Sequence, residues 1–282
     1  MSVKNSLVWM FILLFLITSC DKVYGPYSVV PPVNTNINDT TVIRKVLLED
    51  FTGHKCQGCP AAHAEAQALK NRFQDSMVII TIHAGYFSGY ATAPFTYNFT
   101  TPEGTDIYNS LIPSTQPFPT GTVNRKMYGS NRIVDFPNWG AKVEELLAQP
   151  PQANIKITPT WNASTRVIGG TFLTTFMAPV SGNIALSVYY TEDSIVEWQT
   201  FPASVTVSNY LHRHVLRGAL PAGGTWGSII ASSPLMGSTV TTIITGSPIA
   251  TAIKPEHVSV VAVLFDNTTK ELLHVEEQRL LK

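Results

Sequence analysis

The sequence has few charged residues, which make up 13% of its 282 residues, whereas about 25% is usual for soluble proteins. Lys plus Arg and Asp plus Glu are equal in number, at 19 each, so the formal net charge is zero. A protein that neutralises nucleic-acid phosphates needs a surplus of basic residues. The composition therefore excludes nucleic acid as an expected partner.

Long apolar runs are also absent beyond the first twenty residues, and no later run reaches the ~20 residues that a membrane-crossing helix needs. The apolar run from Leu7 to Ile17 follows a single basic residue, Lys4, and small residues lead from it into Cys20. This pattern is typical of a secretory signal peptide, here residues 1–19. The end of the run, ITSC, resembles a bacterial lipobox, which implies that Cys20 is lipidated and anchors the mature chain to a membrane. An ordinary cleaved signal that happens to precede a cysteine is the alternative.

Cysteine is rare, with three in the whole chain. If Cys20 carries lipid, Cys56 and Cys59 remain as one pair in the oxidising cell envelope, where disulfides persist. We therefore expect a disulfide between Cys56 and Cys59.

The chain is nevertheless rich in core-forming residues, because 44% of it is apolar. Residues 20–43 contain prolines and an Asn/Thr-rich run without periodicity, which indicates a tether. The apolar strand pattern at 45–51, the alanine-rich helix pattern at 60–73 and the apolar strand pattern at 77–83 together predict a βαβ unit. Further along, the sequence predicts a short helix at 106–111, a strand at 119–126 and a helix at 138–149.

Pro150 and Pro151 mark a change to a two-residue period, which is typical of strands. The 31 threonines fit this change, since β-branched residues favour strands. Seven strands without a helix predict a two-sheet sandwich over 151–282. We expect this domain and a domain over 44–150 to fold separately. The expected strands are 153–158, 166–176, 183–191, 212–220, 238–245, 258–265 and 272–280.

The motif Cys56-Gln57-Gly58-Cys59-Pro60 stands between the first predicted strand and the first helix. A cysteine that caps a helix N-terminus has its thiolate stabilised by the helix dipole, and Lys55 adds positive charge. We therefore interpret Cys56 as the attacking thiol and Cys59 as the resolving thiol.

The segment LLEDFTGHKCQGC resembles the strand and active-site loop of the thioredoxin superfamily. The resemblance implies that Asp50 is the buried acid that exchanges a proton with Cys59. It also implies that Pro119 is the cis-proline whose neighbours, Phe118 and Thr120, present backbone to the substrate. Two features depart from the family pattern: Lys55 replaces the usual aromatic residue, and the segment 84–112 is an insertion.

The chain as a whole resembles a narrower family, the 28-kDa outer membrane protein family of bacterial lipoproteins. The resemblance rests on EDFTGHKCQGCP (49–60), FPTGTVNR (118–125), NYLHRHVLRG (209–218) and VVAVLFDNTTKELLHVEEQ (260–278). It implies an α/β thioredoxin-like domain followed by an all-β, immunoglobulin-like sandwich domain, with the protein held at the outer membrane.

These observations predict thiol–disulfide exchange on envelope proteins, whose thiols and disulfides would be the partners. They predict no cofactor and no metal site, although His54 and His63 could join the two thiols as metal ligands. The alternatives are that the disulfide is structural or that the protein is a non-enzymatic surface binding or adhesion lipoprotein. In that last case, the sandwich and the aromatic segment 86–99 would supply the contact surface.

Three further residues have competing interpretations. Asp50 could be an exposed carboxylate at the end of a strand. His212 and His214 alternate along a strand and share a face, which is compatible with a metal pair. Because no other ligand accompanies these two histidines, a solvent-facing or structural role is the stronger interpretation.

We predict that the Cys20→Ala variant is released from membranes, because it lacks the thiol to which lipid is attached. The wild-type protein should partition into the detergent phase and should have lost residues 1–19, as measured by mass spectrometry of the mature chain. A variant that stays membrane-bound, together with a wild type that carries no lipid, would contradict the lipobox interpretation.

Overall fold

The computed structural model describes residues 42–221 and 223–281. The expected signal segment 1–19, the lipidation site Cys20 and all but the last two residues of the tether lie outside the described residues. Within the described ranges, no helix is long and apolar enough to cross a membrane.

The chain begins with the expected βαβ unit, formed by β1 (Val46–Thr52), α2 (Cys59–Phe73) and β2 (Met77–His83). The two strands pair in parallel along their whole length, from Val46 beside Met77 to Thr52 beside His83. Every residue of both strands is buried. Such burial is characteristic of parallel strands that are covered on both faces, and it explains why their sequences are apolar without alternation.

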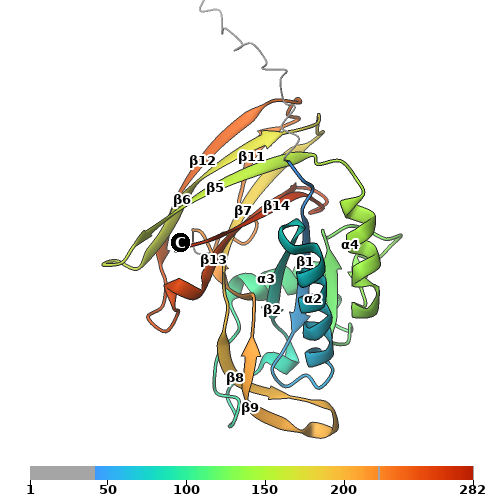
Figure 1. Cartoon of the computed structure of the whole chain (residues 1–282), viewed down its shortest axis with the longest axis vertical. Helices are drawn as coiled ribbons and strands as arrows, with labels where there is room; N and C mark the ends of the chain where they lie inside the picture. The colour runs from blue at the N-terminus through green and yellow to red at the C-terminus, as the bar shows by residue number, and fades with distance from the viewer. Residues whose placement is uncertain (1–41, 222, 282) are drawn as a thin grey trace, which may run out of the picture. The chain divides into compact units, whose positions relative to one another are not determined.

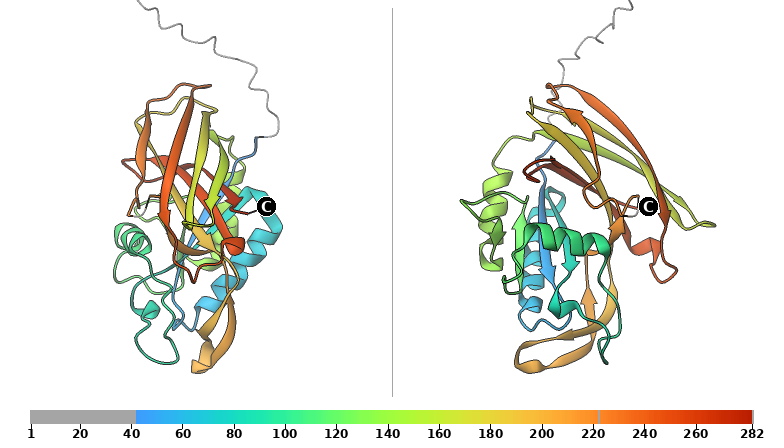
Figure 2. Two further views of the ribbon diagram at one scale, coloured as in Figure 1. Left: turned by 90° about the vertical axis from the view of Figure 1, so that its left-hand side faces the viewer. Right: turned by 180° about the vertical axis from the view of Figure 1, so that it is seen from behind.

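Helices cover both faces of this part of the sheet (Figures 1 and 2). On one face, α2 and α4 (Trp139–Leu147) pack on Val46 and Leu48 of β1. On the other face, α3 (Pro102–Leu111) packs on the apolar side chains of β2. The strand β3 (Thr120–Val123) runs antiparallel to β1, and β4 (Ile133–Val134) follows it at the edge.

The remaining strands follow the double proline. They are β5 (Ala153–Asn162), β6 (Val167–Phe176), β7 (Asn183–Glu192), β8 (Ile195–Thr200), β9 (Thr206–His212), β10 (Val215–Ala219), β11 (Ser228–Ser232), β12 (Thr239–Pro248), β13 (Val258–Asp266) and β14 (Leu272–Arg279). Each of the seven strands expected from the sequence overlaps one of these, whereas β8, β9 and β11 were not expected. The protein is therefore rich in β-structure, with few helices.

Three sheets arise from these strands among the described residues. The largest has the order β14-β13-β7-β10-β2-β1-β3-β4, with β11 also paired to β7; β12-β6-β5 form a second sheet and β8-β9 a third. An apolar core lies between the second sheet and the β7–β13 region of the first, and it joins residues such as Phe172 and Phe176 to Val260 and Leu264.

The largest sheet does not stop at the expected domain boundary, since β10 pairs in parallel with β2 through Val215 and Thr81. The Thr81 amide donates a hydrogen bond to the His214 carbonyl at 2.8 Å. One core cluster also contains residues from both sides of the boundary, among them Phe51 and Val261. Pro150 and Pro151 do fall between α4 and β5, but this arrangement differs from two pieces that fold separately.

A buried ion pair forms between Glu49 of β1 and Arg125, both of which are fully buried. Arg125 Nη2 lies 2.6 Å from Glu49 Oε1, and the Arg125 guanidinium lies 5.1 Å from the ring centre of Trp226 and 5.6 Å from that of Phe265. Burial by itself lowers the pKa of Arg125, but the Glu49 carboxylate outweighs this effect and raises it. Arg125 therefore remains charged, and its contacts with Trp226 and Phe265 connect β1 to residues that come after the double proline.

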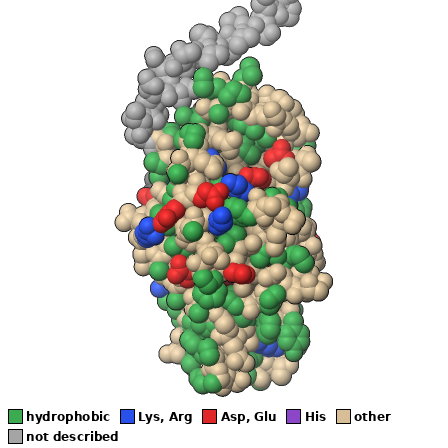
Figure 3. Space-filling view, turned by 90° about the vertical axis from the view of Figure 1, so that its right-hand side faces the viewer, with side chains coloured by type: hydrophobic (Ala, Val, Ile, Leu, Met, Phe, Trp, Pro, Cys, Tyr) green, Lys and Arg blue, Asp and Glu red, His purple; other side chains and the backbone are tan. Residues whose placement is uncertain are grey.

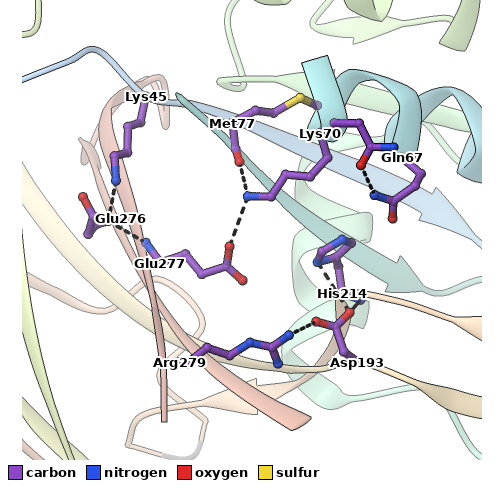
Figure 4. Close-up of polar contacts among 10 residues, drawn as sticks. Lys45, Gln67, Lys70, Met77, Asp193, His214, Glu276, Glu277 and Arg279 are labelled. Carbon is purple, nitrogen blue, oxygen red and sulfur yellow. Dashed lines mark hydrogen bonds and ion pairs between the residues drawn. The ribbon is translucent and has the colours of Figure 1, made fainter. Parts of the chain in front are cut away.

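Ion pairs nearer the surface make further connections across the same boundary (Figure 4). Lys70 of α2 contacts both the Met77 carbonyl, at 2.6 Å, and the Glu277 carboxylate of β14, at 3.4 Å. Lys45 pairs with Glu276 in the same way. Elsewhere, acidic and basic side chains are intermixed on the face shown in Figure 3, as the balanced composition leads us to expect.

We predict that Arg125→Met lowers the free energy of unfolding by about 3–5 kcal/mol, because it leaves the Glu49 carboxylate buried without a counter-charge. Thermal and denaturant unfolding monitored by circular dichroism would measure the loss. The double variant Glu49→Leu/Arg125→Met should recover most of it, since it removes both charges. Since Arg125 connects the two sequence segments, unfolding should remain a single transition, and two separate transitions would contradict the continuous core.

Candidate functional site

Cys56 and Cys59 form a disulfide at the start of α2, with their Cα atoms 5.4 Å apart. Both residues are buried. The helix begins at Cys59, and its N-cap is Gly58. Cys56 is therefore not the cap residue that the motif predicts but lies two residues before it, because Pro60 fits the first turn and the helix starts there.

The loop before β3 packs against this disulfide. The Phe118–Pro119 peptide bond is cis, as the thioredoxin resemblance implies. A Cβ atom added to Gly58 would lie 3.1 Å from Cδ of Pro119, so the proline ring sits directly on the backbone between the two cysteines. Phe118 is half-buried against the rings of Phe87 and Tyr108. Thr120 is the first residue of β3 and is fully buried.

Asp50 lies on β1, where it is paired with Thr81 on one side and Gly121 on the other. It is fully buried, so the alternative of an exposed carboxylate is wrong. Neither carboxylate oxygen has a hydrogen-bond partner in the described part of the chain. This desolvation raises the pKa of Asp50 to about 8. The carboxyl group is therefore largely protonated at neutral pH.

His63, one turn into α2, is the nearest titratable neighbour of Asp50. Its Nε2 lies 3.6 Å from Asp50 Oδ2 and 2.9 Å from the Thr52 hydroxyl, while Nδ1 lies 2.8 Å from the Tyr210 hydroxyl. Burial lowers the pKa of His63 to about 4, so the ring is neutral at neutral pH. Asp50 and His63 are therefore both uncharged, and their contact is not an ion pair.

The metal interpretation placed His54 and His63 beside the two thiols. In the structure, His54 Nε2 bonds to the Gly89 carbonyl at 2.9 Å and the two cysteines bond to each other. The described residues contain no group of three or more His, Cys, Asp or Glu side chains arranged to hold a metal ion.

The hairpin β8–β9, which was not expected from the sequence, packs over the cysteine motif. The Gln199 side-chain amide donates to the Cys56 carbonyl at 3.0 Å, and the Thr200 amide donates to the His54 carbonyl at 2.8 Å. At the tip of the hairpin, Gln57 donates to the Ser204 hydroxyl at 3.3 Å. In the sequence, the aromatic and histidine residues at 209–214 indicate a strand, but their pattern alone places that strand in the sandwich.

The insertion after β2 covers the other side of the motif. The Lys55 amide donates to the Phe87 carbonyl at 3.1 Å. A Cβ atom on Gly53 would lie 2.4 Å from the Phe87 backbone, so only glycine permits this approach. Lys55 extends its ammonium group toward the ring of Phe95, at 5.7 Å from the ring centre.

The aromatic residues of this insertion do not form one exposed surface. Tyr86 and Tyr90 are exposed, at 88% and 44%, but Phe99 is only 1% exposed. Phe99 stacks on His83 with ring centres 4.4 Å apart and contacts His212 at the same distance. Of the aromatic residues in segment 86–99, only Tyr86 and Tyr90 are exposed enough to serve as the contact surface of the adhesion alternative.

The two histidines of residues 212–214 have different surroundings. His212 is 2% exposed and belongs to the aromatic cluster around Phe99, where burial lowers its pKa to about 3. The His214 amide instead donates to the Asp193 carboxylate at 2.9 Å. A solvent-facing role is therefore wrong for His212, and contacts with its neighbours account for both residues.

A cavity of about 320 Å³ opens between α2 and the hairpin. Asp50, His63 and Tyr210 line it together with Pro60, which directly follows Cys59. It reaches the surface, since Ala64 and Arg213 also line it and are exposed. The arrangement thus combines a disulfide, a buried protonated carboxyl group and a route to solvent.

We predict that Asp50→Asn removes a pH dependence of stability in the oxidised protein. The folded pKa of about 8 exceeds the ordinary value of 3.8, so the folded chain keeps a proton that the unfolded chain has released. Wild-type stability should therefore fall as pH rises toward 8, by up to about 1.4 kcal/mol per pH unit, and then level off. Urea unfolding between pH 6.5 and 8 measures this slope, and the difference between wild type and Asp50→Asn removes the contribution of the histidines, which titrate near 6.5 in the unfolded chain.

The control for this experiment is Asp75→Asn, because Asp75 is exposed and its substitution should leave the slope unchanged. The slope is the quantity to compare, since the absolute stability also changes when a buried amide replaces a carboxyl group. Equal slopes for wild type and Asp50→Asn would show that Asp50 is ionised at neutral pH.

Comparisons with solved structures show where this fold recurs. The chain is similar to HBP35 of Porphyromonas gingivalis, with a TM-score of 0.66 and 18% identity over 86% of this chain and 77% of that one. It is also similar to protein AGR_C_4864 from Agrobacterium tumefaciens, with a TM-score of 0.52 and 13% identity over 86% and 96% of the two chains. A domain of the outer membrane lipoprotein Omp28 from Porphyromonas gingivalis aligns with 46% of this chain and 89% of its own, at 20% identity and a TM-score of 0.33. No curated protein matches the chain.

The sequence also matches a family model, that of outer membrane protein Omp28, over residues 106–281. The match begins within α3 and includes the hairpin β8–β9 and every later strand, whereas Cys56 and Cys59 precede it. It covers more than half of the chain and agrees with the resemblance drawn from the sequence motifs. The chain belongs to the Omp28 family of outer membrane proteins.

Proposed function

We propose that this protein is a lipoprotein that carries out thiol–disulfide exchange on envelope proteins while anchored to the outer membrane through Cys20. The observation that carries the proposal is the Cys56–Cys59 disulfide at the start of α2, with the cis-Pro119 ring against the backbone between the cysteines. A disulfide that closes so small a loop contributes little to stability through chain entropy, which disfavours a purely structural role.

We assign a thioredoxin-like fold to the N-terminal α/β part and an immunoglobulin-like sandwich to the strands after Pro151. The first assignment is supported by the β1-α2-β2 unit, by the antiparallel β3 beside β1, and by the position of the cysteines where β1 leads into α2. The second is supported by the apolar core between the two facing sheets.

The exchange reaction proceeds in two steps in the direction that oxidises a substrate. A substrate thiolate attacks Sγ of Cys56, the bond between Cys56 and Cys59 breaks, and a mixed disulfide forms between Cys56 and the substrate. Cys59 leaves as a thiolate and takes a proton from the protonated Asp50. A second substrate thiolate then attacks the mixed disulfide and releases Cys56, which leaves the substrate oxidised and the protein reduced.

Charge near Cys56 favours this oxidising direction. The first turn of α2 contains no acidic residue, and Lys55 directly precedes Cys56. Both features favour the Cys56 thiolate, and a stabilised thiolate stabilises the reduced protein. A protein whose reduced form is stabilised acts as an oxidant or an isomerase.

The substrate backbone would lie along Phe118, Pro119 and Thr120, opposite Cys56. The two exposed tyrosines, Tyr86 and Tyr90, stand on the insertion that packs against the loop before the cysteines. An extended segment of a partially folded envelope protein fits this site, because both its backbone and its apolar side chains would find contacts there.

We predict that Cys59→Ser traps partners as mixed disulfides at Cys56, because the variant keeps the attacking thiol and lacks the resolving one. Non-reducing gel electrophoresis of cells that express the variant should show adducts that disappear on reduction. The double variant Cys56→Ser/Cys59→Ser is the control and should form none. A Cys59→Ser variant without adducts, whose Cys56 alkylates with a pKa at or above the free value of ~8.5, would leave the disulfide as a structural element.

A further inference from the structure

The buried acid of this site lines the cavity but has no exposed surface of its own. Asp50 is fully buried, and its oxygens have no hydrogen-bond partner among the described residues. In the proposed reaction, Asp50 gives a proton to Cys59 in one direction and receives one in the other. A carboxylate left ionised in this position is strongly disfavoured, so each cycle requires a path by which Asp50 exchanges its proton.

His63 lies where such a path would begin. Asp50 and Thr52 are two residues apart on β1, so their side chains leave the same face of the strand. His63 Nε2 lies within 3.6 Å of the Asp50 carboxyl and 2.9 Å of the Thr52 hydroxyl. The Thr52 hydroxyl therefore helps to hold the imidazole ring beside Asp50, at a distance slightly longer than a direct hydrogen bond.

Tyr210 continues the path from the other ring nitrogen. His63 Nδ1 lies 2.8 Å from the Tyr210 hydroxyl. Both side chains line the 320 Å³ cavity, whose wall includes the exposed residues Ala64 and Arg213. The hydroxyl of Tyr210 thus stands between the histidine and a space that reaches solvent.

We propose that His63 and Tyr210 form a proton relay between Asp50 and the solvent-exposed cavity, an inference that rests on the proposed thiol–disulfide exchange. When Asp50 has protonated the Cys59 thiolate, His63 gives its Nε2 proton to Asp50 and receives a proton from the Tyr210 hydroxyl at Nδ1. Tyr210 regains its proton from solvent. The ring changes tautomer without acquiring charge.

The opposite half of the redox cycle resets the relay. When Cys59 loses its proton and attacks the mixed disulfide at Cys56, Asp50 accepts that proton and passes one to Nε2 of His63. The Nδ1 proton then returns to Tyr210 and leaves through the cavity. Because oxidation and reduction alternate, the histidine returns to its first tautomer without rotation of the ring.

The surroundings of the relay keep it uncharged at neutral pH. The titratable and charged groups that interact with it are Asp50, His83, His212 and Arg213, while His54 and Arg217 act on His83 in turn. Burial lowers the pKa of His54, His83 and His212, so these rings are neutral. Burial first and Asp50 second raise the pKa of Tyr210 to about 12, so its hydroxyl keeps its proton.

The relay is tested on the reduced protein with dithiobis-nitrobenzoate, an aromatic disulfide that releases one coloured thiolate in each step. The first release reports attack by Cys56, and the second reports resolution by Cys59. We expect His63→Ala and Tyr210→Phe to slow the second release by about tenfold or more, since positioned proton transfer contributes ~10²-fold or more. Neither substitution should change the first release. The dependence of the second release on pH should become steeper in both variants.

A control variant and a rescue experiment distinguish loss of proton transfer from a structural effect of the substitutions. Gln67→Ala is the control, because Gln67 lines the same cavity one turn further along α2 and has no contact with Asp50; it should behave as wild type. Free imidazole should restore the second release in His63→Ala, whose shortened side chain leaves room in the cavity.

The two proposals fail in different ways. If the wild type releases no coloured thiolate, the thiol–disulfide exchange itself is refuted. If both releases occur and the second is unchanged in His63→Ala and Tyr210→Phe at every pH, the exchange stands and the relay is refuted. A slowed second release with an unchanged pH profile and no rescue by imidazole also refutes the relay.

Discussion

The pairing of β10 with β2 is the constraint on which the rest of the site depends. The chain leaves the large sheet at the end of β7, forms the hairpin β8–β9 and returns to the sheet beside Thr81 of β2. Thr81 lies near the end of β2, and that end is level with the end of β1, where the loop to the cysteines starts. A hairpin that must close at this point therefore reaches Cys56 and His63.

Two neighbouring acids on β1 show that the side chains around a buried carboxyl group decide whether it is charged. Successive residues of a strand point to opposite faces, so Glu49 faces the core of α3 and the C-terminal strands while Asp50 faces α2. Glu49 meets the Arg125 guanidinium and forms a charged pair. Asp50 lies 3.6 Å from a neutral histidine, which does not offset the cost of burying a charge. Burial therefore raises the pKa of Asp50, and the carboxyl group keeps its proton. One acid thus stabilises the fold, and the other is available for proton transfer.

The family match and the disulfide lie in different parts of the chain. The match runs from within α3 to the last strand and contains Gln199 and Tyr210, while the cysteines lie before it. Some of the residues that surround the disulfide, such as Pro119 and Gln199, therefore come from the part shared with the family, whereas Asp50 and Phe87 do not. The site is assembled from both segments.

The sequence by itself determined the local elements of this protein. Apolar runs without alternation predict β1 and β2, and the alanine-rich helical spacing predicts α2. A two-residue period predicts seven of the later strands. The disulfide and the cis bond at Pro119 also followed from motif and resemblance, because the spacing of these residues is local or belongs to a known pattern. The short strands β8 and β9 escaped prediction, since most of their residues are exposed or half-exposed and show no clean alternation of buried and exposed positions.

Only the tertiary structure decided that the two segments share one sheet and one core. Pairing between β10 and β2 joins residues more than 130 positions apart, and no periodicity within either strand encodes its partner. The same long-range contact brings Tyr210 to His63 and leaves Asp50 without a charged neighbour. The raised pKa of Asp50 is a property of burial among distant residues, so sequence alone left an exposed carboxylate as an open alternative.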